Sequence, residues 1–314
     1  MKICYWGSGP ISTFHVPALK ASDIDIISCF SRENSKNLTS FCNKFQLPKA
    51  ETEVEFLEEC AQADAVFVAL KTEHTLTALT KLKGIAKFVF FEKPGSLHWS
   101  GLDTLTNSST KYLSLYNRRF YKPVQFLKES ILKSQDRLNL NFTFPDTKKG
   151  WHQFYINGCH MVDLIMFLLD DFSLDLKSSL SAGPEAGFTF IAKSKKGHIV
   201  TFVNQWGGSE TANLIIYDGK TTYKLQPIER LTISKEMTVK EPSVSFPIRS
   251  YTPKILEEIM ADANFKPGFS EQISEAKKIV LEGSNVIGLG TLEQSIAVVK
   301  FINQLEGQLN ETRN

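Results

Sequence analysis

A glycine-rich turn near the start of the chain has the spacing of a phosphate-binding loop. The apolar run Lys2 to Trp6 ends in Gly7-Ser8-Gly9-Pro10-Ile11-Ser12, which has the first two glycines of the pattern G-x-G-x-x-G and a small serine in place of the third. Gly7 permits a tight turn, Gly9 lets the backbone approach a pyrophosphate, and the following helix offers free N–H groups. The pattern predicts a dinucleotide site; the alternative is an ordinary strand-to-helix turn. The predicted contacts are Gly7, Gly9, Pro10 and Ile11.

The residues about 20 positions further on decide which dinucleotide such a site prefers. A carboxylate there would bond the ribose of NAD(H) and repel the extra phosphate of NADP(H), but the chain has Ser31 and Arg32 after a predicted strand. A hydroxyl followed by a guanidinium favours NADP(H) over NAD(H). Two alternatives stay open: Arg32 could be a solvated loop cation, and Glu33, one residue later, would restore the acid of an NAD(H) site.

A lysine follows the fully apolar run Phe88 to Phe91, in the sequence Glu92-Lys93-Pro94. Open α/β sheets bind their ligands at the carboxyl ends of parallel strands. Pro94 also restricts Lys93 to an extended conformation. Position and fixed geometry together predict a ligand role for Lys93, although a lysine after such a strand is more often a surface residue.

A histidine, His160, occurs within an otherwise apolar predicted helix, residues 155–169. An imidazole has a pKa near neutrality, so it can accept the proton of a hydroxyl group or return it. A nearby ammonium would favour the neutral imidazole and would stabilise negative charge that develops on the oxygen. The alternative for His160 is a buried histidine that is bonded to the backbone.

The glycine turn and Lys93 each follow a predicted strand, so they lie close together only if these strands are parallel neighbours in one sheet. The hydrophobic pattern predicts such a sheet. Residues 1–119 alternate short apolar runs with amphipathic segments, which predicts an α/β fold with an N-terminal Rossmann domain and a doubly wound parallel sheet. After Arg119 the pattern changes to strand-like runs between Gly-Gly and Asp-Gly turns. This change predicts a C-terminal α+β domain, residues 120–314, with a largely antiparallel open sheet. The predicted strands are 2–6, 25–30, 65–70, 88–91, 138–144, 187–192, 198–205, 213–217 and 221–225, and the predicted helices are 11–20, 34–45, 73–83, 125–133, 155–169 and 291–305.

Composition restricts the class of protein. A length of 314 residues predicts about two domains, and 36 basic against 34 acidic residues leave a net charge of +2, without the basic excess of nucleic-acid binding proteins. The five cysteines have no C-x-x-C spacing, so we expect neither disulfides nor a metal site, and a reducing cytoplasm fits best. The apolar runs are far shorter than the roughly 20 residues of a membrane span, and we expect no leader peptide.

Five landmarks follow one another along the chain. They are Gly7-x-Gly9 before His15, Asp64-Ala65-Val66 before His74, Glu92-Lys93-Pro94, Asn117-Arg118-Arg119-Phe120 at the domain crossover, and the segment from Gly158 to Asp163. In this order they resemble the Gfo/Idh/MocA oxidoreductases, a family that includes glucose-fructose oxidoreductase and inositol dehydrogenase. The last segment is similar to the Asp-x-Gly-x-His-x-x-Asp helix of that family.

The resemblance implies hydride transfer between a nicotinamide and a hydroxyl or carbonyl group of a sugar, sugar derivative or polyol. Lys93 matches the lysine near the nicotinamide and the substrate, and His160 matches the acid/base histidine. Glu92 and His74 are further expected cofactor contacts, with a purely structural role as the alternative for His74. It further implies a homodimer or homotetramer formed through the open sheet of the second domain.

The chain departs from the family motif at Ile156, which stands where the family has an aspartate, four residues before His160. On an α-helix these two residues would share a face, so the carboxylate would be missing from the acid/base unit. Asn157 and Tyr155 are the nearby polar candidates for binding substrate, and Arg119 could bind an anionic substrate such as a uronate or sugar nucleotide. For Arg118 and Arg119 a purely structural role is favoured for at least one.

Ile156 also keeps two other functions open. One is a catalytically impaired nucleotide-binding subunit with a regulatory or scaffolding role. The other is an NAD-dependent glycoside hydrolase, in which the cofactor is reduced and reoxidised within one turnover.

Overall fold

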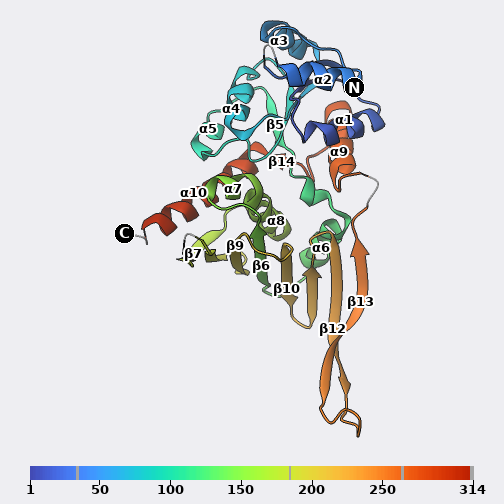
Figure 1. Ribbon diagram of the computed structural model, residues 1–314, viewed down its shortest axis with the longest axis vertical. Helices are drawn as coiled ribbons and strands as arrows, with labels where there is room; N and C mark the ends of the chain where they lie inside the picture. The colour runs from blue at the N-terminus through green and yellow to red at the C-terminus, as the bar shows by residue number, and fades with distance from the viewer. Residues whose placement is uncertain (33–34, 184, 263–264, 312–314) are drawn as a thin grey trace. The chain divides into compact units, whose positions relative to one another are not determined.

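The computed structural model describes residues 1–32, 35–183, 185–262 and 265–311 (Figure 1). Contacts divide the chain into two compact units, and the first division falls after Phe120, next to the boundary predicted at Arg119. Two later segments group with the first unit, so the units are not consecutive halves of the chain. Unit 1 contains Met1–Phe120, Phe154–Leu164 and Ala263–Glu306, and unit 2 contains Tyr121–Gln153, Ile165–Asp262 and Gly307–Asn314.

Unit 1 is built on a six-stranded sheet with the strand order β14-β5-β4-β3-β1-β2. Every neighbouring pair in it is parallel except β14 with β5. The central strands are buried along their whole length, which explains why they are continuously apolar in the sequence. The strands are β1 (Lys2–Trp6), β2 (Asp25–Phe30), β3 (Ala65–Val68), β4 (Phe88–Phe91), β5 (Lys111–Ser114) and β14 (Gly290–Thr291).

The helices of unit 1 lie against this sheet and against one another. Local sequence signals start several of them: the Ser35 hydroxyl accepts from the backbone N–H of Leu38, and Thr52 with Glu55 forms a capping box. Helix α3 packs on β1 and β2, α4 packs on β3, and α1 packs on α9. The helices are α1 (Ser12–Ala21), α2 (Lys36–Phe45), α3 (Glu53–Gln62), α4 (Thr72–Lys81), α5 (Trp99–Asp103) and α9 (Phe269–Glu282), with a 3₁₀ helix at Asn117–Phe120 and a π-helix at Phe154–Gly158. Helices α8 (Cys159–Leu169) and α10 (Leu292–Glu311) begin in unit 1, and their last residues belong to unit 2.

Unit 2 is built on an eight-stranded sheet with the order β13-β12-β11-β10-β6-β9-β8-β7. Only β6 with β9 is parallel in it. Phe142, Phe190 and Phe202 stack in its core, with ring centroids 4.8–5.3 Å apart. The elements are α6 (Lys122–Leu132), β6 (Asn139–Asp146), α7 (Trp151–Gln153), β7 (Asp175–Ser181), β8 (Gly187–Lys193), β9 (Ile199–Trp206), β10 (Asn213–Asp218), β11 (Thr221–Leu225), β12 (Arg230–Lys240) and β13 (Ser250–Met260).

The two sheets confirm the predicted fold class, because one is a parallel sheet with helices and the other is dominated by antiparallel pairs. Among the helices that the structure describes, none is both long enough and apolar enough to cross a membrane.

Candidate active site

The glycine turn lies at the carboxyl end of β1, between the ends of its two neighbours. The backbone N–H of Gly7 donates to the carbonyl oxygen of Phe30 over 2.7 Å, which ties the turn to the end of β2. A Cβ at Gly7 would lie 2.4 Å from the carbonyl oxygen of Ala69, which follows β3. Close approach of the backbones therefore excludes any side chain at Gly7.

Gly9 differs, because a Cβ there would meet no described atom within 4 Å. Packing within the protein does not require this glycine, and the open space beside it suits a bound group that approaches the backbone. Helix α1 begins just after it, with no side-chain cap and no acidic residue in its first turn. An uncapped helix start next to open space fits the phosphates of a dinucleotide. Ser12, the small residue in place of the third glycine, is fully buried.

Ser31 and Arg32 directly follow β2, beside the glycine turn. The indole N–H of Trp6 donates to the carbonyl oxygen of Ser31 over 3.0 Å, which fixes the position of Ser31 next to the end of β1. The side chain of Arg32 is exposed. Glu33, the residue that would favour NAD(H), lies outside the described residues.

At the end of β4, Glu92 forms a buried contact that the sequence reasoning missed. Nε2 of His15, on α1, lies 2.7 Å from a carboxylate oxygen of Glu92, and both side chains are buried. This contact joins the first helix to the strand end that carries Lys93. Both residues were landmarks of the motif pattern, but only the fold shows that they meet.

Lys93 itself reaches the segment before His160. Its Nζ donates to the carbonyl oxygen of Ile156 over 2.7 Å. Ile156 lies in the π-helix Phe154–Gly158, whose wider turn replaces the α-helix that was predicted here. The i, i+4 spacing that was assumed for Ile156 and His160 does not apply in this turn. Ile156 thus contributes its backbone carbonyl oxygen to the binding of Lys93.

Gly158 explains part of the motif that contains His160. A Cβ on Gly158 would lie 2.2 Å from the ring of Phe154. The ring packs directly on the glycine backbone, four residues further along the chain. The glycine is therefore required by this turn, whatever its role in catalysis.

His160 is 7% exposed, and its Nδ1 is buried with no hydrogen-bond partner among the described residues. Burial lowers the pKa of His160 well below its usual value, and the charges of Lys93, Arg118 and Lys266 lower it further. The edge of the Tyr116 ring packs against it, with the centroids 6.0 Å apart. The imidazole is therefore neutral at neutral pH, which is the form that can accept a proton.

Lys266 is a cation of this site that the sequence reasoning missed. Burial and the charges of Lys93 and Arg118 lower its pKa, while Glu92 raises it. It is brought here by the segment before α9, where the side chain of Asn117 donates to the carbonyl oxygen of Pro267 over 3.0 Å. No local sequence signal could have identified it, because Lys266 lies far from the other motifs along the chain.

Arg119, a predicted substrate residue, is fully buried in an ion pair. Its Nε donates to one carboxylate oxygen of Asp163 over 2.9 Å and its Nη2 to the other over 2.5 Å. Its remaining guanidinium nitrogen donates to Gln294 over 2.9 Å. These bonds favour the structural alternative for this arginine. Arg118 differs, because its Nη1 lies 3.2 Å from the sulfur of Met161, next to His160.

The other predicted ligand residues differ in their burial and partners. Tyr155 is buried, and its hydroxyl donates to Glu306 over 2.8 Å and accepts a hydrogen bond from Asn303, both on α10. Asn157 is half-buried, whereas His74 is exposed in the first turn of α4. The structure therefore gathers the glycine turn, Lys93 and His160 in unit 1 but gives Tyr155 partners within the protein.

Comparison with known proteins finds one similar sequence and many similar folds. The myo-inositol 2-dehydrogenase of Thermotoga maritima is 30% identical over 135 residues, which are 42% of this chain and 40% of that enzyme. The matched part thus spans well under half of that relative. A putative NADPH-dependent oxidoreductase from Desulfitobacterium hafniense superposes with a TM-score of 0.78 at 13% identity, covering 99% of this chain and 96% of the other.

A third protein, GenD2 from gentamicin A biosynthesis in complex with NAD, superposes with a TM-score of 0.72 at 15% identity, covering 96% of this chain and 92% of the other. The chain has the fold of the Gfo/Idh/MocA oxidoreductases. The resemblance found in its motifs is thereby confirmed at the level of the fold. No model of a protein family matches the chain.

Proposed function

We propose that this protein is a nicotinamide-dependent oxidoreductase that acts on a hydroxyl or carbonyl group of a sugar, sugar derivative or polyol. One observation carries the proposal: the imidazole of His160 is buried beside a segment that the ammonium of Lys93 reaches, since Nζ of Lys93 donates to the carbonyl oxygen of Ile156 over 2.7 Å. In alcohol oxidation a neutral base can accept the hydroxyl proton, and an ammonium can stabilise the charge that develops on the oxygen. The similarity to a myo-inositol 2-dehydrogenase supports a polyol or sugar as the substrate class.

In the proposed mechanism the protein moves the proton and stabilises the charge on oxygen. In the oxidative direction the neutral imidazole of His160 accepts the proton of the substrate hydroxyl. The ammonium of Lys93 stabilises the negative charge that develops on that oxygen. Its bond to Ile156 O holds it in place, and since an ammonium has three donors, others are available to a ligand. In the reductive direction His160 returns the proton.

A nicotinamide dinucleotide bound at the glycine turn would accept or donate the hydride. Gly7, Gly9, Pro10 and Ile11 would hold its phosphates, and Ser31 and Arg32 would hold its adenosine end. The open space at Gly9 and the uncapped start of α1 support this placement. Glu92 would act through His15, with which it shares a hydrogen bond, and His74 remains a proposed contact.

We favour NADP(H) over NAD(H), because Arg32 is exposed directly after β2 and can pair with a phosphate. The structural neighbours include an NADPH-dependent and an NAD-bound protein, so fold similarity does not decide between the two. Titration of the protein with NADPH and NADH, followed by nicotinamide fluorescence, measures the preference. In an Arg32→Glu variant we expect the affinity for NADPH to fall about tenfold and that for NADH to be retained.

The proposed roles are tested by turnover on a panel of sugars, polyols, uronates and sugar nucleotides, followed by nicotinamide absorbance. His160→Ala should lower kcat by about a hundredfold to ten-thousandfold, and Lys93→Met by about a hundredfold. His98→Ala and Lys87→Met are matched controls, because both side chains are exposed. Full turnover by either site variant on an identified substrate would overturn the assigned roles.

The same assay separates the other functions considered. Tight cofactor binding without turnover on any substrate, and no gain from Ile156→Asp, would indicate a nucleotide-binding subunit with a regulatory or scaffolding role. Glycoside cleavage without net consumption of added NADP(H) would indicate the hydrolase. We also propose that the chain forms a homodimer or homotetramer through the sheet of unit 2, as the resemblance implies.

A further inference from the structure

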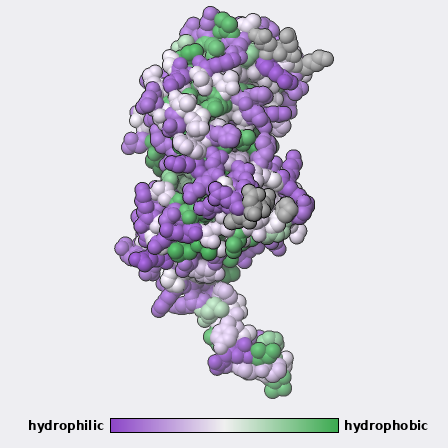
Figure 2. Space-filling view, turned by 90° about the vertical axis from the view of Figure 1, so that its left-hand side faces the viewer, coloured by the Kyte–Doolittle hydropathy of each residue, from purple (hydrophilic) through white to green (hydrophobic). Residues whose placement is uncertain are grey.

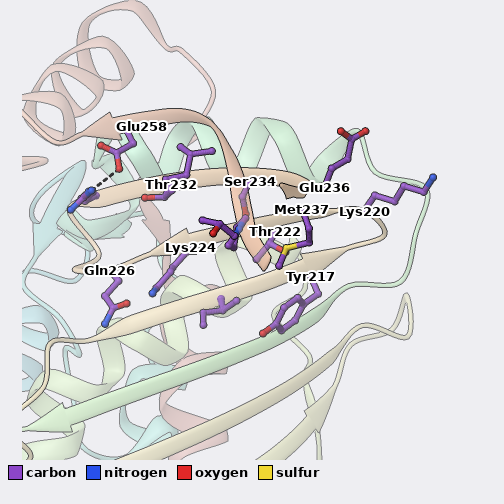
Figure 3. Close-up of a pocket in the computed structure, with 15 residues that line it drawn as sticks. Tyr217, Lys220, Thr222, Lys224, Gln226, Thr232, Ser234, Glu236, Met237 and Glu258 are labelled. Atoms are coloured by element: carbon purple, nitrogen blue, oxygen red, sulfur yellow. Dashed lines mark hydrogen bonds and ion pairs between the residues drawn. The ribbon is translucent and has the colours of Figure 1, made fainter. Parts of the chain in front are cut away.

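Outside the groups assigned to the reaction, the described residues form an open groove in unit 2 and a polar cluster in unit 1. The groove has a volume of about 930 Å³ and is lined mainly by strands β10 to β13 (Figure 3). Beyond it, Figure 2 shows apolar side chains at the tip of the β12–β13 hairpin. This surface belongs to the sheet through which we propose that the chain associates. The polar cluster, around Asn303 on α10, instead contacts the two segments that carry Lys93 and Ile156.

Asn303 binds the turn that follows Lys93. Its Nδ2 donates to the carbonyl oxygen of Leu97 over 3.0 Å, and its Oδ1 accepts from the backbone N–H of Trp99 over 3.4 Å. Trp99 begins α5, whose N-cap residue makes no side-chain cap bond, so the amide of Asn303 supplies an acceptor there. Lys300, one turn earlier on α10, adds a second contact, because its Nζ lies 5.1 Å from the centroid of the Trp99 ring.

The same amide also binds the π-helix. Nδ2 of Asn303 donates to the hydroxyl oxygen of Tyr155, the residue before Ile156. The Tyr155 hydroxyl in turn donates to Glu306, also on α10, over 2.8 Å. Burial and the carboxylate of Glu306 raise the pKa of Tyr155, so the hydroxyl stays protonated at neutral pH and keeps this bond. Glu306 thereby directs the hydroxyl proton away from Asn303 and leaves a lone pair to accept from it.

These bonds join the turn after Lys93 to the π-helix in two places, all within unit 1. In the first, Nζ of Lys93 donates directly to the carbonyl oxygen of Ile156. In the second, Asn303 connects Leu97 with Tyr155, four residues after Lys93 and one residue before Ile156. The first connection uses a donor of the ammonium assigned to the reaction, so it changes whenever that ammonium moves towards a ligand. The second connection does not depend on the ammonium.

We propose that Asn303 is a positioning residue, which keeps the ammonium of Lys93 beside the segment of His160 while the ammonium stabilises charge on the substrate oxygen. Its bonds to Leu97 and Tyr155 hold the two segments together when the bond to Ile156 weakens. A misplacement of about 1 Å in a reacting group can cost about a hundredfold in rate, so this second connection affects turnover without touching a ligand. The inference rests on the proposed function, in which Lys93 and His160 act on the same oxygen.

Kinetics of single variants give the first test. Asn303→Leu keeps a similar volume and removes both the donors and the acceptor, so we expect kcat to fall about tenfold with the KM for substrate and the affinity for dinucleotide unchanged. Tyr155→Phe breaks the same connection from its other end and should lower kcat to a similar extent. Gln304→Leu, on the exposed side of α10, is the matched control and should leave kcat unchanged. An unchanged kcat in Asn303→Leu, or a raised KM with unchanged kcat in Tyr155→Phe, would overturn the proposal.

A double-mutant cycle with Lys93→Met tests whether Asn303 acts through the ammonium. If it does, Asn303→Leu should change kcat by less than about twofold in the Lys93→Met background, because the group that it positions is gone. A loss of stability that is merely structural would lower kcat equally in both backgrounds. A full tenfold effect in the Lys93→Met background would therefore contradict the positioning role.

The same cycle in urea unfolding needs no substrate, so it separates this inference from the proposed function. Since both connections join the same two segments, Asn303→Leu and Lys93→Met should be non-additive, with a coupling of about threefold to tenfold in the equilibrium constant of unfolding. Gln304→Leu and Lys93→Met should be additive. Additive effects of Asn303→Leu and Lys93→Met would overturn the inference, whereas coupling in a protein without turnover on any substrate would contradict the proposed function alone. Circular dichroism of each variant verifies that it folds.

Discussion

The segment around His160 and the arm, residues 236–253 of the hairpin β12–β13, differ in which side chains they bury and which they expose. Near His160, charged groups are withdrawn from water: Arg119 forms a buried pair with Asp163, and the half-buried Lys93 donates to the backbone. In the arm, apolar groups such as Val239 and Tyr251 are exposed. Burying charge and exposing apolar surface both cost free energy. The Arg119–Asp163 pair offsets that cost beside His160, whereas the arm leaves its apolar side chains exposed to water.

The difference in burial predicts that breaking an ion pair lowers the free energy of unfolding near His160 but not in the arm. Arg119→Met leaves the carboxylate of Asp163 buried without its cation, so we expect a loss of about 3–5 kcal/mol in the free energy of unfolding. Arg249→Met breaks the ion pair with Glu241 in the arm, where water solvates both groups, and we expect no measurable change. Urea unfolding of both variants measures the contrast. Similar losses in the two variants would show that burial does not distinguish these regions.

Gly158 and Gly9 allow the effect of packing to be distinguished from the effect of ligand binding in unit 1. Gly158→Ala forces a Cβ against the Phe154 ring, and we expect a loss of about 1–3 kcal/mol in stability. Gly9→Ala meets no described atom within 4 Å, so its stability should be unchanged while its affinity for the dinucleotide falls. Thermal unfolding and cofactor titration of both variants check this. A destabilised Gly9→Ala with unchanged affinity would assign Gly9 to packing instead.

Sequence predicted the first region better than the second, for a physical reason. Gly7, Lys93 and His160 are marked by local patterns, since strand ends and fixed turns determine where they lie. The π-turn at Ile156 was predicted as α-helix, because the close packing of Phe154 on Gly158 has no periodic signature. Lys266 joined the site only through the fold.

The arm was not predicted at all, and α3, α9 and β5 were also missed. The strands β12 and β13 have irregular pairing at Ile233–Met237, which breaks the alternation of apolar and polar residues along the hairpin. A strand prediction that relies on strict alternation fails at such an irregularity. Beyond it Val239 and Tyr251 are exposed.

The smallest predicted effect concerns pH. Burial lowers the pKa of His160 in the folded protein, so the unfolded chain binds more protons once the pH falls below the ordinary value of 6.5. The free energy of unfolding should therefore decrease as the pH falls from 6.5 towards the folded pKa, by up to about 1.4 kcal/mol per pH unit from this group. His160→Phe should remove that part of the slope in urea unfolding measured at several pH values.

The arm provides the control for this pH effect. Residues 230–260 contain no histidine, the side chain whose ordinary pKa lies near 6.5. The Arg249→Met variant should therefore lose stability with falling pH to the same extent as the unmodified protein. A slope that persists in His160→Phe would show that His160 is not the titrating group.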